Sequence, residues 1–420
     1  MAAHDDPSVV RRSQLVDIAR SAPLGVLMAM ESSILLTIAI KHFDASWWVK
    51  SLLAAGNGVG LLAAPLITSL ARRSGRPVMV PAVYLSVVGG AGLLAAAAGA
   101  ELVFVLGAMV GVATVNAVYP LTTVTYERNF PPEELGRRVG WGMSMKVLVS
   151  AGSGLSIGWF LTRNPEKWWV VVLAAGAASL VLAFLNAQMP SEPLARLEGV
   201  RTSAWPHFHL LREDRRLALT LGAWMVLGFG NLMLLPLRVE YLAQPEYGID
   251  ASAAKIAVLT IVVPSAVRFL TMPLFGMVFD RMSFFAARIM VNVLFALYVA
   301  AFFTGTSTAG LVVGAVVLGL GAAGGDLMWS LWVTKFAPAG RTADYMGLHT
   351  FFTGIRAFLA PLVGFAVLGN VSLSGVAVGA ALLMVLSSLV LVPEARAERR
   401  SRAAAAAVAA APTPQVTAGR

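Results

Sequence analysis

The sequence contains no cysteine, only five histidines and few charged side chains. Without cysteine the chain forms neither a disulfide nor a thiolate site for zinc or an iron–sulfur cluster, and its histidines lack the HExxH spacing of zinc hydrolases. Charged residues make up 13% of the 420 residues, about half of the ~25% that is typical of soluble proteins. With 58% apolar residues and a mean hydropathy of +0.75, a soluble enzyme would expose much of its apolar surface. That class of protein is excluded.

Long apolar runs are what the sequence has in abundance. A helix needs about 20 mostly apolar residues to cross a bilayer, and the chain contains twelve such runs. They are too long, and too rich in Gly and Ala, for the strands of a membrane β-barrel. We therefore predict an all-α integral membrane protein with twelve transmembrane helices. The predicted spans are residues 21–41, 48–70, 78–99, 102–125, 140–162, 168–189, 215–238, 253–278, 286–304, 309–334, 346–369 and 372–392.

Lysine and arginine are unevenly divided between the two sides of this predicted topology. An even number of helices puts both termini on one side, and most basic residues, Arg20 and Arg288 included, fall on that side too. Because cytoplasmic loops are enriched in Lys and Arg, we predict cytoplasmic termini in a plasma membrane of the bacterial inner-membrane type. The net charge of +10 then belongs to basic loops and not to a nucleic-acid surface. The basic residues predicted for the opposite loops are Lys41, Lys50, Arg163, Lys167, Arg238 and Lys255.

A polar stretch divides the chain into two related halves of six predicted helices each. Pro65 recurs as Pro273, 208 residues later. Two further positions recur 207 residues later: Pro131 as Pro338, and Gly140 as Gly347. A six-helix unit duplicated in one orientation is typical of secondary transporters, whose site lies between the halves near the membrane midplane. The predicted domains are a cytoplasmic segment (1–19) that is not a cleavable signal, a six-helix bundle (20–189), a cytoplasmic loop (190–214), a second bundle (215–392) and a disordered cytoplasmic tail (393–420).

The loop after the second helix of each half carries a recognisable motif. In the second half it reads Gly276-Met277-Val278-Phe279-Asp280-Arg281-Met282-Ser283, and in the first half Thr68-Ser69-Leu70-Ala71-Arg72-Arg73-Ser74-Gly75-Arg76. With the twelve-helix topology, these segments resemble the signature loop of the major facilitator superfamily, roughly Gly-x-Leu-Ala-Asp-Arg-x-Gly-Arg-Arg. The resemblance covers about residues 20–392. It implies two pseudo-symmetric six-helix bundles that move a solute by alternating access.

The resemblance also implies a gate on the cytoplasmic side. The family's Asp contacts a neighbouring Arg and the positive N-terminal end of a helix in the other half, so Asp280 with Arg281 would latch onto the start of helix 140–162. The first copy keeps the residues Arg73, Gly75 and Arg76, but Arg72 stands where the family has Asp and cannot make that contact. In the alternative interpretation, these arginines only set the membrane topology.

Five charged residues fall well inside predicted helices: Glu31, Lys146, Arg268, Asp326 and Arg356. A charge at the centre of a membrane helix costs about 2.5–3.5 kcal/mol, so we expect these side chains to face one another or a water-filled cavity. The resemblance implies that helices 1, 4, 7 and 10 line that cavity and that helices 2, 5, 8 and 11 flank it, which suits all five.

Each of these charges has a predicted role. Guanidinium groups match carboxylates and phosphates in geometry, so Arg268 and Arg356 are predicted to bind an anionic group of the substrate. Low-dielectric surroundings favour a protonated carboxyl group, so Glu31 is predicted to exchange a coupling proton. Asp326 and Lys146 lie at similar depth and are predicted to form an inner-gate ion pair. Alternatively, all five are internal ion pairs that hold helices together. Further residues predicted to line the cavity are Asn57, Asn116, Tyr119 and His349.

The sequence leaves three hypotheses for the function. The first is a proton-coupled transporter of a small anionic or zwitterionic solute, since three bases and two acids leave one positive charge over. The second is an exporter of drugs or other amphipathic compounds, although helix 140–162 lacks the proline of the Gly-Pro-x-x-Gly-Gly motif common in such exporters. The third is a membrane scaffold or sensor, in which all buried charges pair and no cavity exists. An enzyme is not predicted, and neither is a metal, a cofactor or an oligomer; the expected partners are the solute, protons and lipid.

Overall fold

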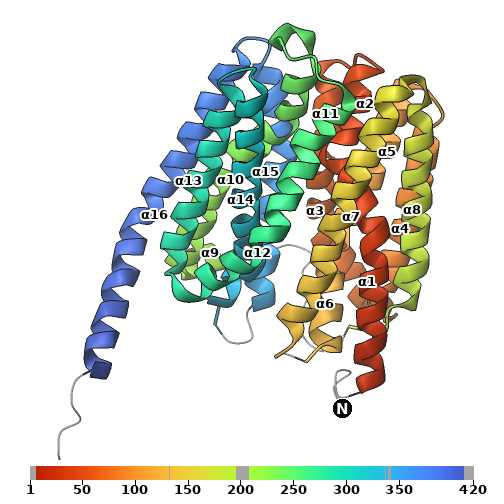
Figure 1. Ribbon diagram of the computed structural model, residues 1–420. Coiled ribbons are helices and arrows are strands. Elements are labelled where there is room, and N and C mark those ends of the chain that lie inside the picture. The colour runs from red at the N-terminus through yellow and green to blue at the C-terminus, as the bar shows by residue number, and fades with distance from the viewer. Residues whose placement is uncertain (1–5, 132, 195–207, 336, 339–341, 411–420) are drawn as a thin grey trace, which may run out of the picture.

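Long helices run side by side through the whole chain in the computed structural model (Figure 1). The structure describes residues 6–131, 133–194, 208–335, 337–338 and 342–410. Within these ranges eleven helices are long and apolar enough to cross a membrane. A further apolar helix, Val80–Ala96, has 17 residues and is about 26 Å long, close to the ~30 Å of a hydrocarbon core. These helices correspond to the twelve predicted spans.

The two halves have the same order of crossings. In the first half the elements are α1 (Pro7–Ala29), η2 (Met30–Ile34), α2 (Leu35–Lys41), α3 (Trp47–Ser74), α4 (Val80–Ala96), α5 (Glu101–Ala117), α6 (Tyr119–Asn129), α7 (Leu135–Arg163), η3 (Pro165–Lys167) and α8 (Trp168–Gln188). In the second half they are α9 (Leu210–Glu213), α10 (Arg215–Ala243), η4 (Pro245–Tyr247), α11 (Ala253–Ala257), η5 (Val258–Val262), α12 (Val263–Arg281), α13 (Phe284–Phe303), α14 (Thr308–Leu331), η6 (Trp332–Lys335), α15 (Thr342–Val367) and α16 (Leu373–Ala410).

Short polar side chains mark where several helices begin. The Asp6 carboxylate accepts a 2.8 Å hydrogen bond from the Ser8 N–H, and the Asp214 carboxylate accepts one of 3.0 Å from the Leu217 N–H. Such caps satisfy N–H groups that have no partner inside the helix. At the other end of α3, Gly75 adopts a left-handed conformation with φ of 64°, which ends the helix at little steric cost. The sequence therefore fixes these boundaries locally.

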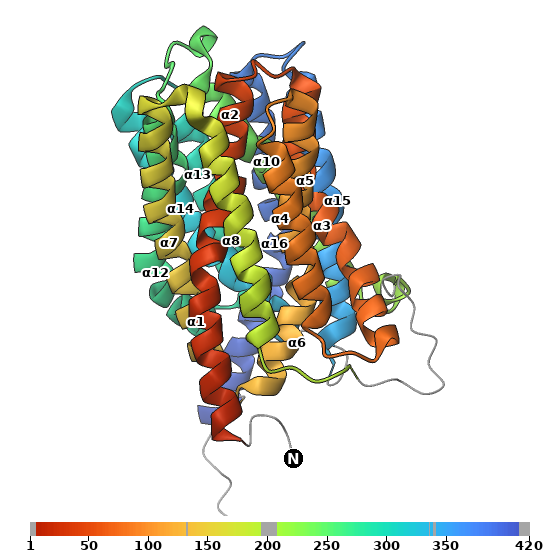
Figure 2. The same cartoon turned by 90° about the vertical axis from the view of Figure 1, so that its right-hand side faces the viewer.

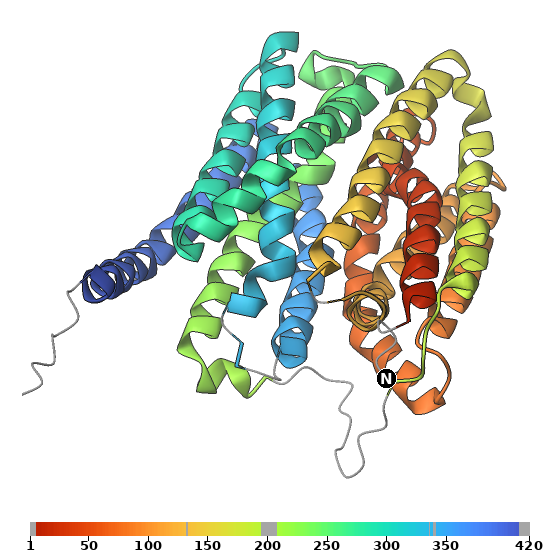
Figure 3. The same cartoon turned by 60° about the horizontal axis from the view of Figure 1, so that its bottom comes forward.

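Both ends of the described chain lie at the same end of the bundle. The start of α1 and the far end of α16 project from one side in Figures 1 and 2. We call this side the terminal face and the opposite side the distal face. Seen toward the terminal face, the helices of the first half lie together on one side and those of the second half on the other (Figure 3). The boundary between the halves therefore runs from one face to the other.

Ion pairs join the two halves near the distal face. Lys50 at the start of α3 pairs with Glu240 near the end of α10, and both side chains are buried, 8% and 6% exposed. Lys41 pairs with Asp250 closer to the surface. In addition, the Thr162 hydroxyl accepts a 2.9 Å hydrogen bond from the Ala254 N–H. These contacts close the distal side.

Glycine permits the closest approach between the halves, where α3 packs along α15. A Cβ atom at Gly58 would lie 2.6 Å from the Cα of Phe358, and one at Gly354 would lie 2.9 Å from the amide nitrogen of Leu62. Neither distance is compatible with a side chain unless the helices separate, so small residues set this interface, as in other membrane helix pairs.

The terminal side is not closed in this way. The aromatic rings of Tyr119 on α6 and Trp329 on α14 meet across the two halves at 6.1 Å. Between described side chains, no hydrogen bond or ion pair joins the halves nearer the terminal face than this contact. Among the described residues, the ion pairs that join the two halves therefore lie at the distal face.

Several expectations from the sequence differ from the structure. The tail expected to be disordered from residue 393 is helical through Ala410, because its alanine-rich stretch strongly favours helix. The first helix begins at Pro7 and not near residue 21. The span predicted at 102–125 is divided at Val118, since Pro120 cannot donate the hydrogen bond that a continuous helix requires.

Four basic residues assigned to loops lie buried inside helices instead. Each is no more than 6% exposed, so their charges belong to the helix packing and not to surface topology signals. They are Arg20, Lys50, Arg238 and Arg288. Lys50, Arg238 and Arg288 already fall at the ends of the predicted spans 48–70, 215–238 and 286–304, and counting them as loop charges overlooked that a helix end can be buried by its neighbours.

Breaking the buried pair of Lys50 and Glu240 should open the distal side. Removing one partner of a buried pair leaves an uncompensated charge, at a cost of about 3–5 kcal/mol. That cost falls on the state with a closed distal side, where Glu240 cannot reach water. It is enough to shift the equilibrium between the closed and open states by more than about tenfold. We expect Lys50→Met to increase labelling of an Ala54→Cys reporter by an impermeant maleimide applied to the distal side; the chain has no cysteine of its own.

Two companion variants decide the interpretation of that labelling. Lys41→Met removes the more exposed pair, whose side chains are 32% and 61% exposed, and should change labelling little because surface pairs contribute about 0–1 kcal/mol. Exchanging the charges, Lys50→Glu with Glu240→Lys, should restore low labelling. Equal labelling of the Lys50→Met and Lys41→Met variants would contradict the assignment.

Candidate functional site

Glu31 lies in a wide π-helical turn, η2, that interrupts the first crossing near its middle. Its carboxylate accepts hydrogen bonds from two amide side chains of neighbouring helices, at 2.6 Å from Asn57 on α3 and 3.3 Å from Asn116 on α5. Asn116 also donates to the Val112 carbonyl, at 3.0 Å, which fixes the orientation of its amide. The structure thus brings together three of the predicted site residues. Turns of this kind inside α-helices often mark functional positions.

Arg268 and Asp326 form the corresponding centre of the second half. Arg268 on α12 pairs with the Asp326 carboxylate on α14, and the two side chains are 15% and 36% exposed. An exposed carboxylate in the middle of a membrane-spanning helix is stable only beside water or a partner charge. This pair therefore marks an accessible space at mid-depth.

Tyr119 connects the two centres. It begins α6, is 39% exposed, and its ring meets that of Trp329, one turn after Asp326 on α14. The Trp329 indole N–H in turn donates a 3.4 Å hydrogen bond to the Thr353 hydroxyl. The aromatic pair spans the space between the halves and offers flat surfaces to a bound molecule.

Lys146 does not form the predicted inner-gate ion pair with Asp326. It lies half-buried on α7 and interacts electrostatically with three acids, Asp17, Glu31 and Asp326, without a hydrogen bond or ion pair to any described side chain. The Asp326 carboxylate pairs with Arg268 instead, because α12 packs directly on α14. The prediction was wrong in its partner, although Lys146 does belong to the same central group of charges.

Arg356 and His349 lie behind Trp329, whose ring is 5.4 Å from that of His349. Arg356 is 7% exposed, and its guanidinium donates to the Trp224 carbonyl on α10 and, at 3.1 Å, to the Thr353 hydroxyl. His349 is 1% exposed, and its ring lies 4.6 Å from that of Trp224. Both residues are therefore packed into the second half, so the prediction of an anion anchor facing the cavity does not hold for Arg356.

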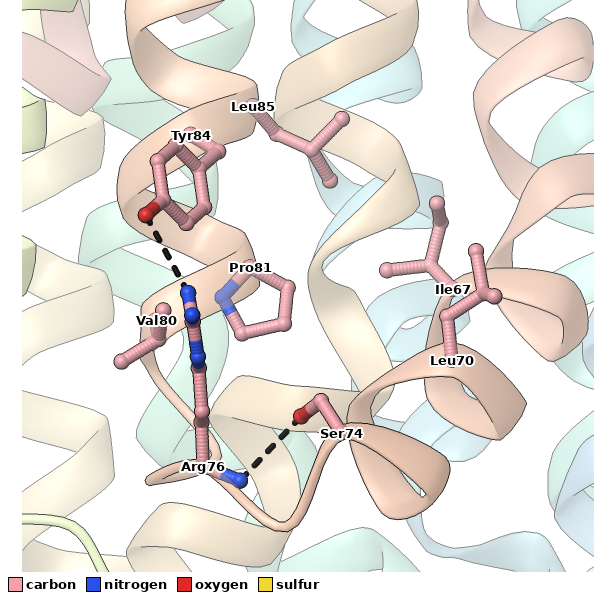
Figure 4. Close-up of a pocket in the computed structure, with 8 residues that line it drawn as sticks. All are labelled: Ile67, Leu70, Ser74, Arg76, Val80, Pro81, Tyr84 and Leu85. Atoms are coloured by element: carbon pink, nitrogen blue, oxygen red, sulfur yellow. Dashed lines mark hydrogen bonds between the residues drawn. The ribbon is translucent and has the colours of Figure 1, made fainter.

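The first copy of the signature loop borders a groove between α3 and α4 (Figure 4). Arg76 donates hydrogen bonds from its guanidinium to the Tyr84 hydroxyl, at 3.4 Å, and from its backbone to the Ser74 hydroxyl, at 3.2 Å. Arg73 is exposed and makes no ion pair with a described residue, and neither does Arg72. The groove, about 300 Å³, is otherwise lined by Ile67, Leu70, Val80, Pro81 and Leu85. Among the described residues, no contact of this loop with the second half closes a gate.

The second copy ends α12 at the terminal face. The side chain of Asp280 lies outside the described residues, while Arg281 is exposed. The expected target of the latch, the start of α7, holds Glu134, whose carboxylate accepts hydrogen bonds of 2.7 Å from both Arg137 and Arg138. These arginines keep the pKa of Glu134 below its usual value, mainly through the hydrogen bond from Arg138.

Sequence reasoning missed a buried charged cluster in the first half. Asp17 accepts a hydrogen bond from the Tyr126 hydroxyl and lies 3.5 Å from Arg20, and both charged side chains are almost fully buried. The i, i+3 spacing of Asp17 and Arg20 was the available signal. It was overlooked because both precede the first strongly apolar run. Within the described part of the chain, no three acidic or histidine side chains converge in a way that could hold a metal ion.

Comparisons with known proteins agree with this architecture. The model of the Major Facilitator Superfamily matches residues 21–361. The nucleoside transporter NupG has a similar structure, with a TM-score of 0.68 and 14% identity over 90% of this chain and 97% of that chain. A D-xylose-proton symporter has a TM-score of 0.63 and 14% identity, over 92% of this chain and 97% of that chain. A bacterial homologue of the human lysosomal transporter Spinster, solved in an inward-facing and unoccupied conformation, has a TM-score of 0.61 and 14% identity, over 93% of this chain and 96% of that chain.

At these identities the solved structures establish a common fold and nothing more specific. No curated protein matches the chain in sequence. The family model, by contrast, covers most of the chain, and the two six-helix halves with their signature loops agree with it. The chain belongs to the major facilitator superfamily of membrane transporters.

Proposed function

We propose that the protein is a proton-coupled secondary transporter of a small zwitterionic solute, which it moves by alternating access between its halves. The observation that carries this proposal is the exposed pair of Arg268 and Asp326 facing the Glu31 centre across the contact of Tyr119 with Trp329. Polar groups of both halves thus meet at mid-depth. Between described side chains, the ion pairs that join the halves lie at the distal face, which suits a state of an alternating-access cycle that is closed on that side.

The balance of charges favours a zwitterion over a simple anion. Two acids, Glu31 and Asp326, and two bases, Lys146 and Arg268, belong to the central group, whereas Arg356 is bonded elsewhere. The positive excess inferred from the sequence is therefore absent from this space. A solute that carries both charges can pair its anionic group with Arg268 or Lys146 and its cationic group with a carboxylate.

Glu31 is the proposed proton carrier. Its carboxylate is held by two neutral amides, without a direct ion pair to a described residue, and so can gain or lose a proton without breaking a salt bridge. Asp326 is tied to Arg268, which makes it the better partner for a solute ammonium group. The resemblance in fold to a D-xylose-proton symporter is compatible with coupling to protons.

We assign the terminal face to the cytoplasm of a bacterial-type inner membrane. The exposed arginines Arg73, Arg76 and Arg137 lie on that face, and cytoplasmic loops are enriched in such residues. We propose that the state with its ion pairs at the distal face is closed on the outer side, and that the protein is a monomer that acts on its solute without a chemical reaction. A scaffold without transport is disfavoured, because it predicts that no charged group is accessible at mid-depth.

The proposed solute class can be tested by thermal unfolding of the purified protein. Zwitterions such as serine, proline and glycine betaine should raise the melting temperature, since a ligand at a hundred times its Kd adds about 2.7 kcal/mol of stability. Lactate, succinate and xylose should have little effect. Arg268→Gln should abolish the shift, and Arg163→Gln, at an exposed site near the distal face, should keep it. Stabilisation by cationic dyes alone would instead identify an exporter of amphipathic compounds.

Proton coupling can be tested with the stabilising zwitterion in proteoliposomes. Glu31→Gln should retain exchange of labelled against unlabelled solute but lose accumulation driven by a pH gradient, because the amide cannot carry a proton. Glu166→Gln makes the same chemical change in the distal loop between α7 and α8 and should leave accumulation intact. Gradient-driven accumulation by the Glu31→Gln variant equal to that of the unaltered protein would refute this role.

A further inference from the structure

A cationic cluster in which no described side chain is an acid lies inside the second half, beside the proposed transport path. Its framework is aromatic: the Trp224 ring on α10 lies 5.5 Å from that of Trp332 and 4.6 Å from the ring of His349 on α15. The rings of Trp332 and His349 are 5.3 Å apart. Three segments that are distant in sequence therefore meet in one aromatic cluster.

Two guanidinium groups reach this framework. Arg288 on α13 is 4% exposed and lies over the Trp224 ring, with its Cζ 4.3 Å from the ring centre. Arg356 on α15 lies farther along the same ring, at 5.9 Å. Arg288 makes no hydrogen bond or ion pair with any described residue, and Arg356 contacts only a carbonyl and a hydroxyl. Stacking on an indole face attracts a cation but does not neutralise it.

The cluster is rich in hydrogen-bond donors that have no acceptor. The buried nitrogens without a partner include Trp224 Nε1, His349 Nε2, Arg288 Nε and Arg356 Nε. Buried donors are almost always satisfied in native proteins, by protein, water or an ion. Four unsatisfied donors around two uncompensated cations therefore indicate an acceptor that carries negative charge.

The first half shows what such an acceptor looks like. The offset of 207 residues that relates the halves places Asp17 at the position of Trp224 and Gly142 at the position of His349. These equivalents are in contact as well, since a Cβ atom at Gly142 would lie 3.1 Å from the Asp17 carboxyl carbon. In the first half, then, a carboxylate of the chain occupies the place and pairs with Arg20. At the same offset in the second half, Trp224 stands in the place of Asp17 and Leu227 in the place of Arg20, and the cations are supplied instead by Arg288 and Arg356.

We propose that the second half binds a small monovalent inorganic anion, such as chloride, between Arg288, Arg356, His349 and Trp224. The anion takes the role that the Asp17 carboxylate has in the first half. It accepts hydrogen bonds from the N–H groups that lack a partner, and it neutralises the two guanidinium groups. The close packing of the three rings leaves room only for a small ion. Bound there, the anion ties α10, α13 and α15 together without entering the solute path, so the inference does not depend on the proposed function.

Thermal unfolding in defined salts tests the site. The protein in lipid nanodiscs is transferred to sodium gluconate and titrated with chloride or bromide at constant ionic strength. We expect a melting temperature that rises and then saturates, as mass action requires for one site. Arg288→Gln should raise the half-saturating concentration at least about tenfold, as expected when one partner of a buried charge contact is removed. Arg163→Gln also removes a guanidinium from a tryptophan face, that of Trp159 at 3.4 Å, but on the outer surface, and should respond normally.

A second variant supplies the missing carboxylate. A Cβ atom at Gly228 on α10 would lie 2.6 Å from the Arg356 guanidinium carbon, so Gly228→Asp would place a carboxylate beside that group. The flexible guanidinium can shift to form the pair. We expect this variant in gluconate to melt near the temperature of the unaltered protein in saturating chloride, and to show no further response to chloride. It keeps the proposal testable if Arg288→Gln does not fold.

Three results would overturn the proposal. The first is a melting temperature of the unaltered protein that is the same in gluconate, chloride and bromide. The second is a chloride response that persists unchanged in both Arg288→Gln and Gly228→Asp, which would identify a general salt effect. The third is stabilisation by phosphate but not by chloride, which would contradict a small monovalent ion.

Discussion

The cost of a charge in low-dielectric surroundings is the constraint on which the rest of this structure depends. A membrane-spanning bundle tolerates an ionic side chain only where a partner, a hydrogen bond or water compensates it. Lys50 and Glu240 meet this condition as a buried pair, Glu31 through two amides, and Arg268 with Asp326 as a pair open to an accessible space. The buried pair lies near the distal face, and the other two groups lie at mid-depth, where the proposed solute site is.

The same constraint gives the two halves a reason to move. Ion pairs hold the halves together at the distal face and glycine contacts hold them together at mid-depth, whereas nearer the terminal face no hydrogen bond or ion pair joins the described side chains of the two halves. Separating the distal side would expose Lys50 and Glu240 to water, which hydrates them once their mutual attraction is lost. A side closed by an ion pair can therefore open without leaving an uncompensated ion, because water hydrates both charges. An apolar seal of equal area would instead expose apolar surface to water.

The internal duplication shows how one framework serves two kinds of site. At the 207-residue offset, Tyr119 in the first half corresponds to Asp326 in the second, so an aromatic hydroxyl and a carboxylate occupy equivalent places on either side of the central space. Asp17 and Trp224 are related in the same way. Substitutions at equivalent positions have thus separated the halves chemically, while the helix packing that the family shares has been kept.

The sequence by itself determined the number of crossings, the division into two related halves and the identity of most central residues, because apolar run length, repeat offsets and isolated charges are local properties. It named Glu31 with Asn57 and Asn116, and Arg268 with Asp326, but could not pair them. Only the tertiary structure decided that Asp326 binds Arg268 and not Lys146, that Arg356 lies on Trp224 away from the cavity, and that Lys50 and Arg288 are buried. Partners depend on which helix faces meet, and charges at helix ends appear as loop residues until a distant partner buries them.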